Sequence, residues 1–391
     1  MYSFQGIGPG RRSVAPDTST VPHQGLFPET PPDEEAVRSR TVQATLIHAP
    51  RDIRVETVPD PVLSTGGDAI VRVVAACVCG SDLWPYRGIV PTKRPHRIGH
   101  EFVGVVEQVG NEVDRIRVGD FVIAPFYDCD MTCLNCRNGV STSCLHGGWW
   151  GADDRMGGFA DGGQGERVRV PHADGSLVAV PGGPPAPELV PHLLTLSDVM
   201  GTGHHAAHSA GVTRGSTVAV VGDGAVGLCA VLAAKRLGAA RIVAMSRHEP
   251  RQRLATEFGA TDIVAERGDE GIERIKALFD GIGPDAVLEC VGTEESMDQA
   301  IRSVRPGGVV GYVGVPNGGA ELPIRTMFGS NVGVRGGVAP VRNYVEELLP
   351  EVLDGRIRPG LVFDLELPLA EAAEAYAAMD ERRAIKVLLR P

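Results

Sequence analysis

The sequence predicts an α/β protein of two domains, one rich in β-strands and one built on a doubly wound parallel sheet. The chain has 391 residues, which is more than one hydrophobic core usually organises. Short apolar runs broken by Gly, Pro and Asp fill residues 41 to 180. The middle third instead alternates compact apolar strands with helical segments. Such alternation is typical of a parallel sheet covered by helices on both faces.

Residues 1–40 precede the first predicted strand. They are rich in Pro, Gly, Ser and Thr and show neither a helical nor a strand period, so we predict a disordered extension. The run that begins at Val42 is typical of a first strand. We therefore hypothesise that the native chain starts downstream of residue 1.

The β-rich domain is predicted over residues 41–199. Alternation and β-branched residues indicate strands, and a spacing of about ten residues favours an irregular β-rich fold. The clearest strands are expected at residues 69–78, 102–110, 120–126 and 166–171.

The parallel-sheet domain is predicted over residues 200–339. Its strands are expected at residues 216–222, 241–246, 261–266, 285–292, 309–316 and 331–336. Helices are expected between the strands, for example at 225–238 and 270–280. Residues 340–391 then alternate helix, strand, helix and strand, and we expect the last strand to rejoin the first domain.

Charge and hydropathy exclude several classes of partner. Lys and Arg number 38 against 49 Asp and Glu, a net charge of -11, which opposes binding to nucleic acid. No apolar stretch approaches the roughly 20 residues that span a bilayer. No apolar segment follows Arg11 and Arg12 either, so no secretion signal is expected. We therefore predict a cytoplasmic location and no membrane partner.

Four of the eight cysteines crowd into sixteen residues and predict a structural zinc site. Cys129, Cys133, Cys136 and Cys144 could together wrap one tetrahedral ion. Asp130 complicates this assignment, because it lies where a CxxCxxC register would put the first ligand and zinc also accepts carboxylate oxygen. The sequence leaves open whether Cys129 or Asp130 completes the site.

A dinucleotide-binding fingerprint follows the predicted strand at 216–222. Gly222, Gly224 and Gly227 form GxGxxG at the start of an apolar helix. Glycine is needed there because the turn is tight and the backbone approaches a pyrophosphate closely.

The end of the next strand indicates which cofactor is preferred. A carboxylate at this point binds the ribose of NAD(H), but here the chain carries Ser246, Arg247 and His248. Because a guanidinium can bind a phosphate bidentately, NADP(H) is favoured over NAD(H). The alternative is that Arg247 is only a solvated charge.

A second set of metal-binding residue types is scattered along the chain. It comprises Cys79, His100, Glu101 and Asp198. Because these spacings are not helical, only the tertiary fold could bring the four side chains together. Taken singly, each also has an ordinary structural interpretation, such as core packing or helix capping.

Several segments resemble the zinc-dependent medium-chain alcohol dehydrogenase family over residues 41–391. They are CGSDL at Cys79–Leu83, GHE at Gly99–Glu101, the cysteine-rich lobe, the fingerprint and AIKVLL near the end. The resemblance implies a GroES-like catalytic domain built from both ends of the chain around a central Rossmann domain. It also implies a homodimer or homotetramer.

The resemblance also assigns the catalytic zinc site. Cys79 and His100 match two zinc ligands, and Asp198 takes the third position, where many members have Cys. This departure is similar to the formaldehyde dehydrogenase branch. Glu101 matches a residue that approaches zinc, for which we expect a transient or outer role.

Further roles follow from the same resemblance. Ser81 matches a proton-relay hydroxyl, Thr202 a neighbour of the nicotinamide, Val226 a residue packed behind that ring, and Lys386 a basic residue near the pyrophosphate. Trp84 stands where many relatives continue the relay with His.

Trp84 and Tyr86 are expected to wall the pocket with aromatic surface, which suggests a substrate with an apolar body. His204, His205 and His208 are interpreted as helix residues rather than a second metal site.

The predicted function is hydride transfer between NADP(H) and an alcohol or aldehyde at a zinc site. The alternatives are an NAD-dependent polyol, sugar or formaldehyde-type dehydrogenase and, in another class, a non-catalytic nucleotide-binding protein. A zinc-free quinone reductase of the same fold is disfavoured, because every zinc-ligand position has a plausible occupant.

Overall fold

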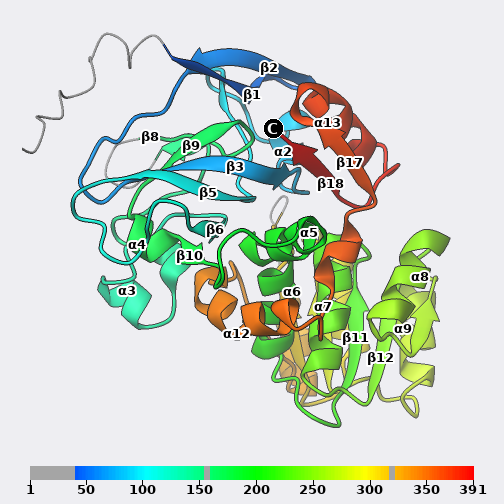
Figure 1. Cartoon of the computed structure of the whole chain (residues 1–391). Helices are drawn as coiled ribbons and strands as arrows, with labels where there is room; N and C mark the ends of the chain where they lie inside the picture. Colours follow the sequence, from blue (N-terminus) through cyan, green and yellow to red (C-terminus); the bar gives the residue numbers. More distant parts are fainter. Residues whose placement is uncertain (1–39, 154–158, 317–321) are drawn as a thin grey trace, which may run out of the picture. The chain divides into compact units, whose positions relative to one another are not determined.

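The computed structural model describes residues 40–153, 159–316 and 322–391. The predicted extension at residues 1–40, except Arg40, lies outside the described residues. Figure 1 shows the β-rich part around β1, β3 and β5 and the helix-covered part around α6, α7 and β11. In the described ranges no helix is both long and apolar enough to cross a bilayer.

The β-rich domain contains two main sheets. The smaller has the order β2-β1-β4, with β1 Thr41–Ala49, β2 Asp52–Pro59 and β4 His96–Arg97. The larger has the order β10-β6-β5-β3-β18-β17, with β9 also paired to β3. Its strands are β3 Ala69–Cys77, β5 Phe102–Val109, β6 Phe121–Ala124, β9 Arg167–Val170, β10 Val178–Ala179, β17 Leu365–Pro368 and β18 Val387–Arg390. The last strand pairs antiparallel with β3, so the chain's end completes this sheet.

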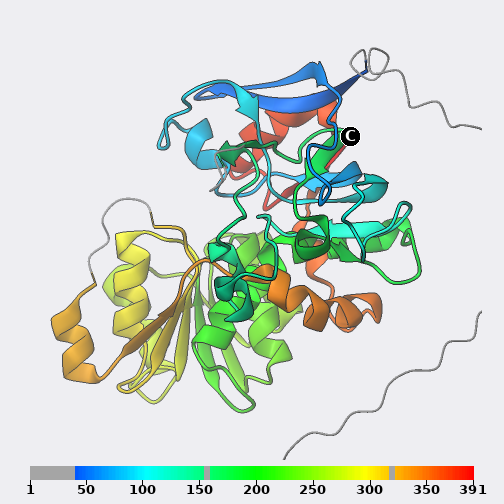
Figure 2. The same cartoon turned by 90° about the vertical axis from the view of Figure 1, so that its left-hand side faces the viewer.

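The second domain is built on a six-stranded sheet in which every pair is parallel. Its order is β13-β12-β11-β14-β15-β16. The strands are β11 Thr217–Val221, β12 Arg241–Met245, β13 Asp262–Val264, β14 Ala286–Glu289, β15 Val309–Tyr312 and β16 Gly333–Gly336. Figure 2 shows this sheet with helices on both sides. The predicted α/β fold class is confirmed.

Alternate residues of β11 explain why helices cover both faces. Val218 and Val220 pack in one cluster with α6 Val199–Ser209, α7 Ala225–Arg236 and α8 Glu249–Phe258. Ala219 and Val221 point the other way, into a cluster with α9 Gly268–Ala277 and α10 Glu294–Ser303. A strand buried on both faces needs apolar residues at every position, as the run TVAVV provides.

Shorter elements connect these sheets. The remaining helices are α2 Leu83–Tyr86, α3 Leu134–Arg137, α4 Ala173–Ser176, α5 Val190–Leu194, α11 Ile324–Ser330, α12 Val341–Leu353 and α13 Ala372–Asp380. The 3-10 turns are Ser141–Ser143, Pro187–Leu189, Thr195–Ser197, Pro359–Val362 and Leu369–Glu371. A small hairpin pairs β7 Ala152–Asp153 with β8 Phe159–Ala160.

Candidate active site

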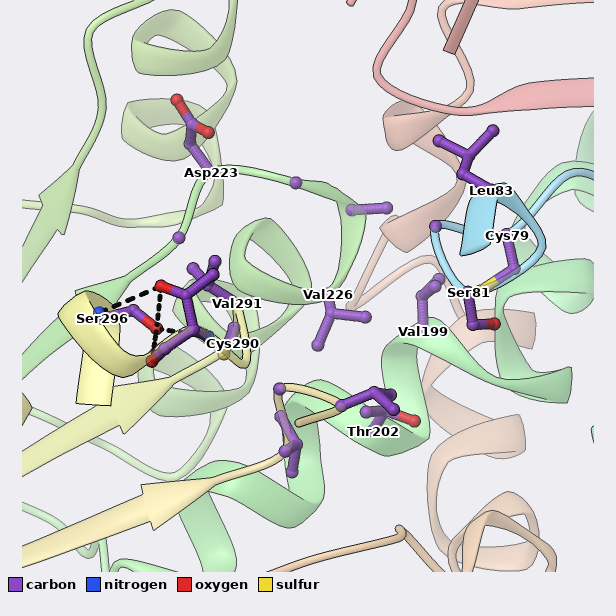
Figure 3. Close-up of a pocket in the computed structure, with 18 of the residues that line it drawn as sticks. Cys79, Ser81, Leu83, Val199, Thr202, Asp223, Val226, Cys290, Val291 and Ser296 are labelled. Carbon is purple, nitrogen blue, oxygen red and sulfur yellow. Dashed lines mark hydrogen bonds between the residues drawn. The ribbon is translucent and has the colours of Figure 1, made fainter. Parts of the chain in front are cut away.

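A cleft of about 1410 Å³ lies at the carboxyl ends of β11 and β14. The strand order reverses between these two strands, and ligands of doubly wound sheets bind at such a reversal. The cleft is lined by the glycine-rich turn after β11 and also by Cys79, His100 and Asp198. Figure 3 shows Cys79 and Ser81 on one side of this pocket and Asp223 on the other. The fold therefore brings the fingerprint and the scattered metal-binding residue types into one cavity.

The three fingerprint glycines form the turn between β11 and α7. Gly222 has a φ of 118°, a backbone conformation that favours glycine. A Cβ on Gly227 would lie 2.0 Å from the carbonyl oxygen of Gly222, so only glycine permits this close approach. Gly224 caps the 12-residue helix α7 and lines the cleft. The first amides of α7 can therefore face an anion in the cleft.

Of the three predicted residues after β12, only Arg247 lines the cleft. Ser246 is fully buried, and its hydroxyl donates to Asp223 Oδ2 at 2.7 Å. His248 is exposed and directly precedes α8. The structure thus places Ser246 behind the fingerprint turn and His248 outside the cleft lining.

The cleft is also lined by arginines that the sequence analysis did not identify. Arg251, Arg267 and Arg382 also line the cleft, and Arg251 Nη1 lies 3.4 Å from Asp223 Oδ1. Burial lowers the pKa of Arg267, Asp223 raises it, and the charges of Arg247 and Arg382 lower it. The position of Asp223 between two fingerprint glycines could have identified it as a cleft residue from the sequence. No local sequence pattern identifies Arg382 in this way. This end of the cleft concentrates positive charge.

Ligand atoms of Cys79, His100, Glu101 and Asp198 all lie within 4.8 Å of one another. Cys79 follows β3, His100 and Glu101 precede β5, and Asp198 precedes α6. Asp198 Oδ2 lies 3.6 Å from Cys79 Sγ and 3.5 Å from His100 Nε2. Sulfur, imidazole nitrogen and carboxylate oxygen are the donors that zinc takes in proteins, so these residues fit a zinc ion.

Asp82 orients the imidazole of His100. Asp82 Oδ1 lies 3.1 Å from His100 Nδ1, and Asp82 Oδ2 accepts from the amide of Cys79 at 3.0 Å. This contact leaves His100 Nε2 to face Cys79 and Asp198. Burial opposes a charge on His100, but the carboxylate of Asp82 and the sulfur of Cys79 raise its pKa well above the ordinary value.

Glu101 and Lys386 form a fully buried ion pair beside this group. Lys386 Nζ lies 2.7 Å from Glu101 Oε1 and donates to the carbonyl of Val78. Lys386 lines the cleft, close to where a cofactor's pyrophosphate is expected, and its ammonium group contacts Glu101. The reason is that a buried carboxylate requires a partner. Glu101 Oε2 has no hydrogen-bond partner among the described residues.

The remaining residues assigned by resemblance line the same cleft. Ser81 Oγ lies 3.5 Å from His100 Nε2. Thr202 Oγ1 donates to Asp198 Oδ1 at 2.6 Å, which fixes that carboxylate. Val226 lies between the metal-binding group and Asp223 (Figure 3).

Aromatic side chains line the cleft, but of the two predicted ones only Trp84 does so. Trp84 lines it together with Phe126 and Trp149, whose rings stack with centroids 5.7 Å apart. Tyr86 instead packs on Tyr376, with ring centroids 5.6 Å apart. The prediction that Tyr86 walls the pocket is not met, because residues two apart on a helix face different directions.

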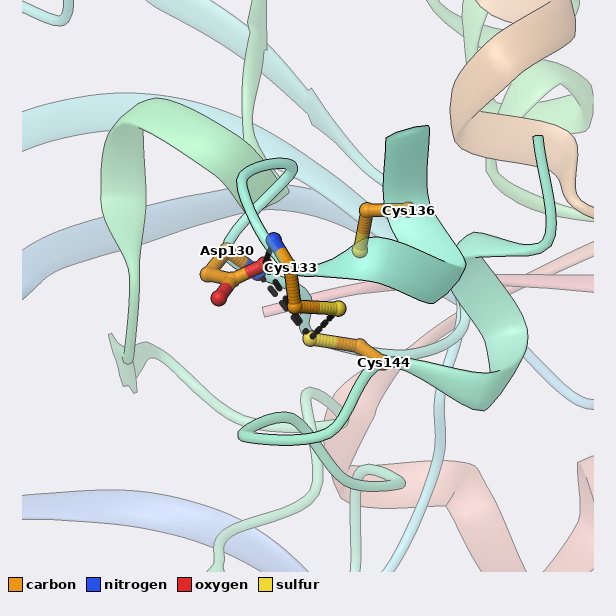
Figure 4. Close-up of side chains that lie close together, drawn as sticks. All are labelled: Asp130, Cys133, Cys136 and Cys144. Atoms are coloured by element: carbon orange, nitrogen blue, oxygen red, sulfur yellow. Dashed lines mark hydrogen bonds between the residues drawn. The ribbon is translucent and has the colours of Figure 1, made fainter. Parts of the chain in front are cut away.

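The cysteine-rich lobe brings Asp130, Cys133, Cys136 and Cys144 together, with ligand atoms within 4.8 Å of one another. Figure 4 shows these four side chains converging. Cys129 is not in the group, because its Sγ faces the carbonyl of Gly175 at 3.7 Å. His146 Nδ1 lies 2.5 Å from Asp130 Oδ2 and holds that carboxylate in place. Of the two alternatives, the geometry favours Asp130.

The histidines of α6 are separate from both groups. His204, His205 and His208 surround Tyr344, with ring centroids 4.8 to 6.1 Å away. Among the residues that the structure describes, only the two groups above have the geometry of a metal site.

Two protein-family models match the chain. An alcohol dehydrogenase GroES-like domain matches residues 65–182, and a zinc-binding dehydrogenase model matches residues 225–354. A probable zinc-binding alcohol dehydrogenase of Mycobacterium tuberculosis is 36% identical over 354 residues, covering 90% of this chain and 89% of the relative. The chain belongs to the zinc-dependent alcohol dehydrogenase family.

Solved structures of alcohol dehydrogenases share the whole fold. Alcohol dehydrogenase TADH from Thermus sp. ATN1 has a TM-score of 0.81 and 35% identity, covering 89% of this chain and 99% of that one. A zinc-binding dehydrogenase from Sinorhizobium meliloti 1021, solved bound to NADP, has a TM-score of 0.77 and 27% identity, covering 90% of this chain and 100% of that one. These matches confirm the family resemblance. As a zinc-dependent alcohol dehydrogenase, the protein is an oxidoreductase that acts on CH–OH groups.

Proposed function

We propose that the protein transfers hydride between NADP(H) and an alcohol or aldehyde with an apolar body. Cys79, His100 and Asp198 would hold the catalytic zinc, and Glu101 would take an outer or transient role. The observation that carries the proposal is this buried sulfur, nitrogen and oxygen donor set, which lines the same cleft as the dinucleotide fingerprint.

The side chains of the cleft would have different roles in the reaction. When bound, zinc supplies Lewis acidity to the substrate oxygen, and the nicotinamide supplies or accepts the hydride. Ser81, whose Oγ lies 3.5 Å from His100 Nε2, would move the proton of the substrate hydroxyl. Thr202 and Asp82 hold Asp198 and His100 in position. Because Trp84 cannot relay a proton, the proton would leave by another route, such as the ribose and water.

The arginines after β12 and β13 support NADP(H) as the cofactor. Arg247 and Arg267 both line the cleft. They follow β12 and β13, the two strands that lie beside β11 on one side of the sheet. Guanidinium groups bind phosphate dianions bidentately, and the three residues directly after β12 include no carboxylate that could bind a free ribose. The NADP in the related Sinorhizobium meliloti structure supports the same choice.

The wall formed by Trp84, Phe126 and Trp149 supports an alcohol or aldehyde with an apolar or aromatic body. Aromatic rings bury large apolar areas of a ligand and favour stacked or edge-on contacts with its rings.

We further propose a catalytic domain of residues 41–199 and 340–391 around a Rossmann domain of residues 200–339. The pairing of β18 with β3 supports this division. A homodimer or homotetramer fits the exposed edge strand β16. The cysteines of the lobe converge with Asp130 as in a metal site, a use of cysteine that supports a reducing compartment such as the cytoplasm.

Zinc analysis of purified variants tests the proposed sites. Asp198→Ala should lose the zinc of the cleft and reduce activity by at least about 100-fold, while the lobe keeps its zinc. Asp130→Ala should lose only the lobe zinc. Cys129→Ser, the matched control, should keep both ions. Unchanged zinc content in Asp198→Ala would refute the assignment of the third ligand.

A further inference from the structure

A chain of buried hydrogen bonds connects the return segment to His100. Tyr376 Oη lies 3.1 Å from Gln164 Oε1, and Gln164 Nε2 lies 3.4 Å from Asp82 Oδ2. Asp82 Oδ1 in turn lies 3.1 Å from His100 Nδ1. Gln164 and Tyr376 are both fully buried. Tyr376 belongs to α13, close to the end of the chain, and Gln164 lies between β8 and β9.

The direction of each hydrogen bond in this chain is forced. Gln164 Nε2 also lies 3.0 Å from the carbonyl oxygen of Cys77, which can only accept, so the amide nitrogen must face this side. Gln164 Oε1 then faces Tyr376 and can only accept, so the tyrosine hydroxyl donates. Burial and the charge of Asp82 raise the pKa of Tyr376 well above its ordinary value, so the hydroxyl keeps its proton.

The same ordering extends to the imidazole. Asp82 accepts from Gln164 Nε2 and from the amide of Cys79 through one oxygen, and its other oxygen faces His100. A carboxylate can only accept, so His100 Nδ1 carries the proton. In the neutral imidazole, Nε2 then presents its lone pair toward Cys79 and Asp198.

Gln164 also contacts the backbone next to His100. A Cβ on Gly99 would lie 2.3 Å from Gln164 Cγ, so the glutamine side chain fills the space beside this glycine. The amides of Gly163 and Gln164 donate to the carbonyls of Gly99 and Ile98. Gln164 is therefore fixed to the segment that carries His100 by both its backbone and its side chain.

We infer that Tyr376 and Gln164 are positioning residues that set the orientation and tautomer of His100 through Asp82. The inference rests on the proposed function, because it treats His100 as a zinc ligand. It also assigns a role to the return segment: α13 completes the support of a ligand that lies more than two hundred residues earlier in the sequence. Partners of this kind make a ligand more basic and hold its ring in place.

The rate of zinc release to a chelator tests the inference in Tyr376→Phe, Gln164→Leu and the double variant. Gln164→Leu should release the cleft zinc roughly 10- to 100-fold faster, the usual effect of losing such a partner. Tyr376→Phe should accelerate release less. Because both residues act through one chain, the double variant should release zinc no faster than Gln164→Leu.

Two controls separate positioning from a general loss of structure. The lobe zinc should leave every variant at the wild-type rate. Tyr86→Phe removes a neighbouring hydroxyl that is not part of the chain, and it should leave the release of the cleft zinc unchanged. With cobalt in place of zinc, Gln164→Leu should also alter the visible absorption of the cleft site, a signature that a purely structural role would not move.

Equal release of the cleft zinc from wild type and Gln164→Leu would overturn the inference. So would additive effects in the double variant, or equal acceleration of release from the lobe. If the wild-type cleft binds no zinc, the proposed function itself fails, so the two failures are distinguishable.

Discussion

Arg247 is the side chain on which we expect the choice between NADPH and NADH to depend. It lies directly after Ser246, which is buried against Asp223, and it lines the cleft with Arg251 and Arg267. Asp223 is already engaged by Ser246 and Arg251. Arg247 is exposed and is therefore accessible to a phosphate on the ribose.

We expect Arg247→Asp to reverse the proposed preference for NADPH over NADH. Loss of charge-assisted hydrogen bonds and repulsion of the phosphate should lower kcat/KM for NADPH by about 10- to 100-fold, with little loss for NADH. Initial rates with the two cofactors measure the ratio. Arg253→Asp, on the exposed side of α8 and paired with Glu249, is the matched control and should leave the ratio unchanged. A wild-type preference for NADH would contradict the assignment.

Helix α6 combines a site residue with a buried histidine in one element. Asp198 precedes the helix, and Thr202 fixes its carboxylate within the first turn. Further along, His204 is 2% exposed, and its ring packs edge-on against Tyr344 of α12. Burial lowers the pKa of His204 to about 4, although Glu347 raises it. The folded protein therefore favours the neutral imidazole.

This burial should make the protein less stable in mild acid. The folded-state pKa of His204 lies below its unfolded value, so its contribution is fully present above about pH 6.5 and is lost as the pH falls toward 4. Between about pH 6.5 and pH 4, the free energy of unfolding of His204→Gln should fall by about 2 kcal/mol less than that of wild type. Urea unfolding at several pH values measures the difference. Identical pH profiles for wild type and His204→Gln would contradict the expectation.

One edge of the parallel sheet bears on how whole molecules associate. In the described ranges β16 pairs only with β15 and forms the end of the sheet. The adjacent α11 carries Phe328 at 86% and Ile324 at 64% exposure. An unpaired strand edge beside large exposed apolar side chains is typical of a surface covered by another chain.

We expect Phe328→Glu to weaken association of this protein with itself. A charge in an apolar interface costs several kcal/mol when it has no partner, so dimers or tetramers should dissociate to monomers at micromolar concentration. Light scattering coupled to size-exclusion chromatography measures the mass. Val118→Glu, at another exposed apolar position, should retain the wild-type mass. A wild-type protein that is already monomeric would contradict the expectation.

Local patterns were sufficient to predict most elements and the cysteine-rich lobe, whereas the metal-binding group of the cleft was assigned by the family resemblance. The strand expected at 241–246 is Arg241–Met245, and the helix expected at 225–238 is Ala225–Arg236. Strand and helix periods arise from neighbouring residues, so a single sequence displays them. The prediction that Tyr86 lines the cleft was wrong, because nearness to Trp84 in sequence does not determine the direction of a side chain.

The amino-acid sequence alone established the α/β class, the glycine turn and the residue types that could bind zinc, because these depend on local spacing and on the chemistry of each side chain. Contacts between distant segments needed the folded chain. Lys386 contacts Glu101, Asp130 rather than Cys129 joins the lobe cysteines, and Tyr376 supports His100 through Gln164. Those pairings depend on which side chains are buried together, where each buried polar group must find a partner.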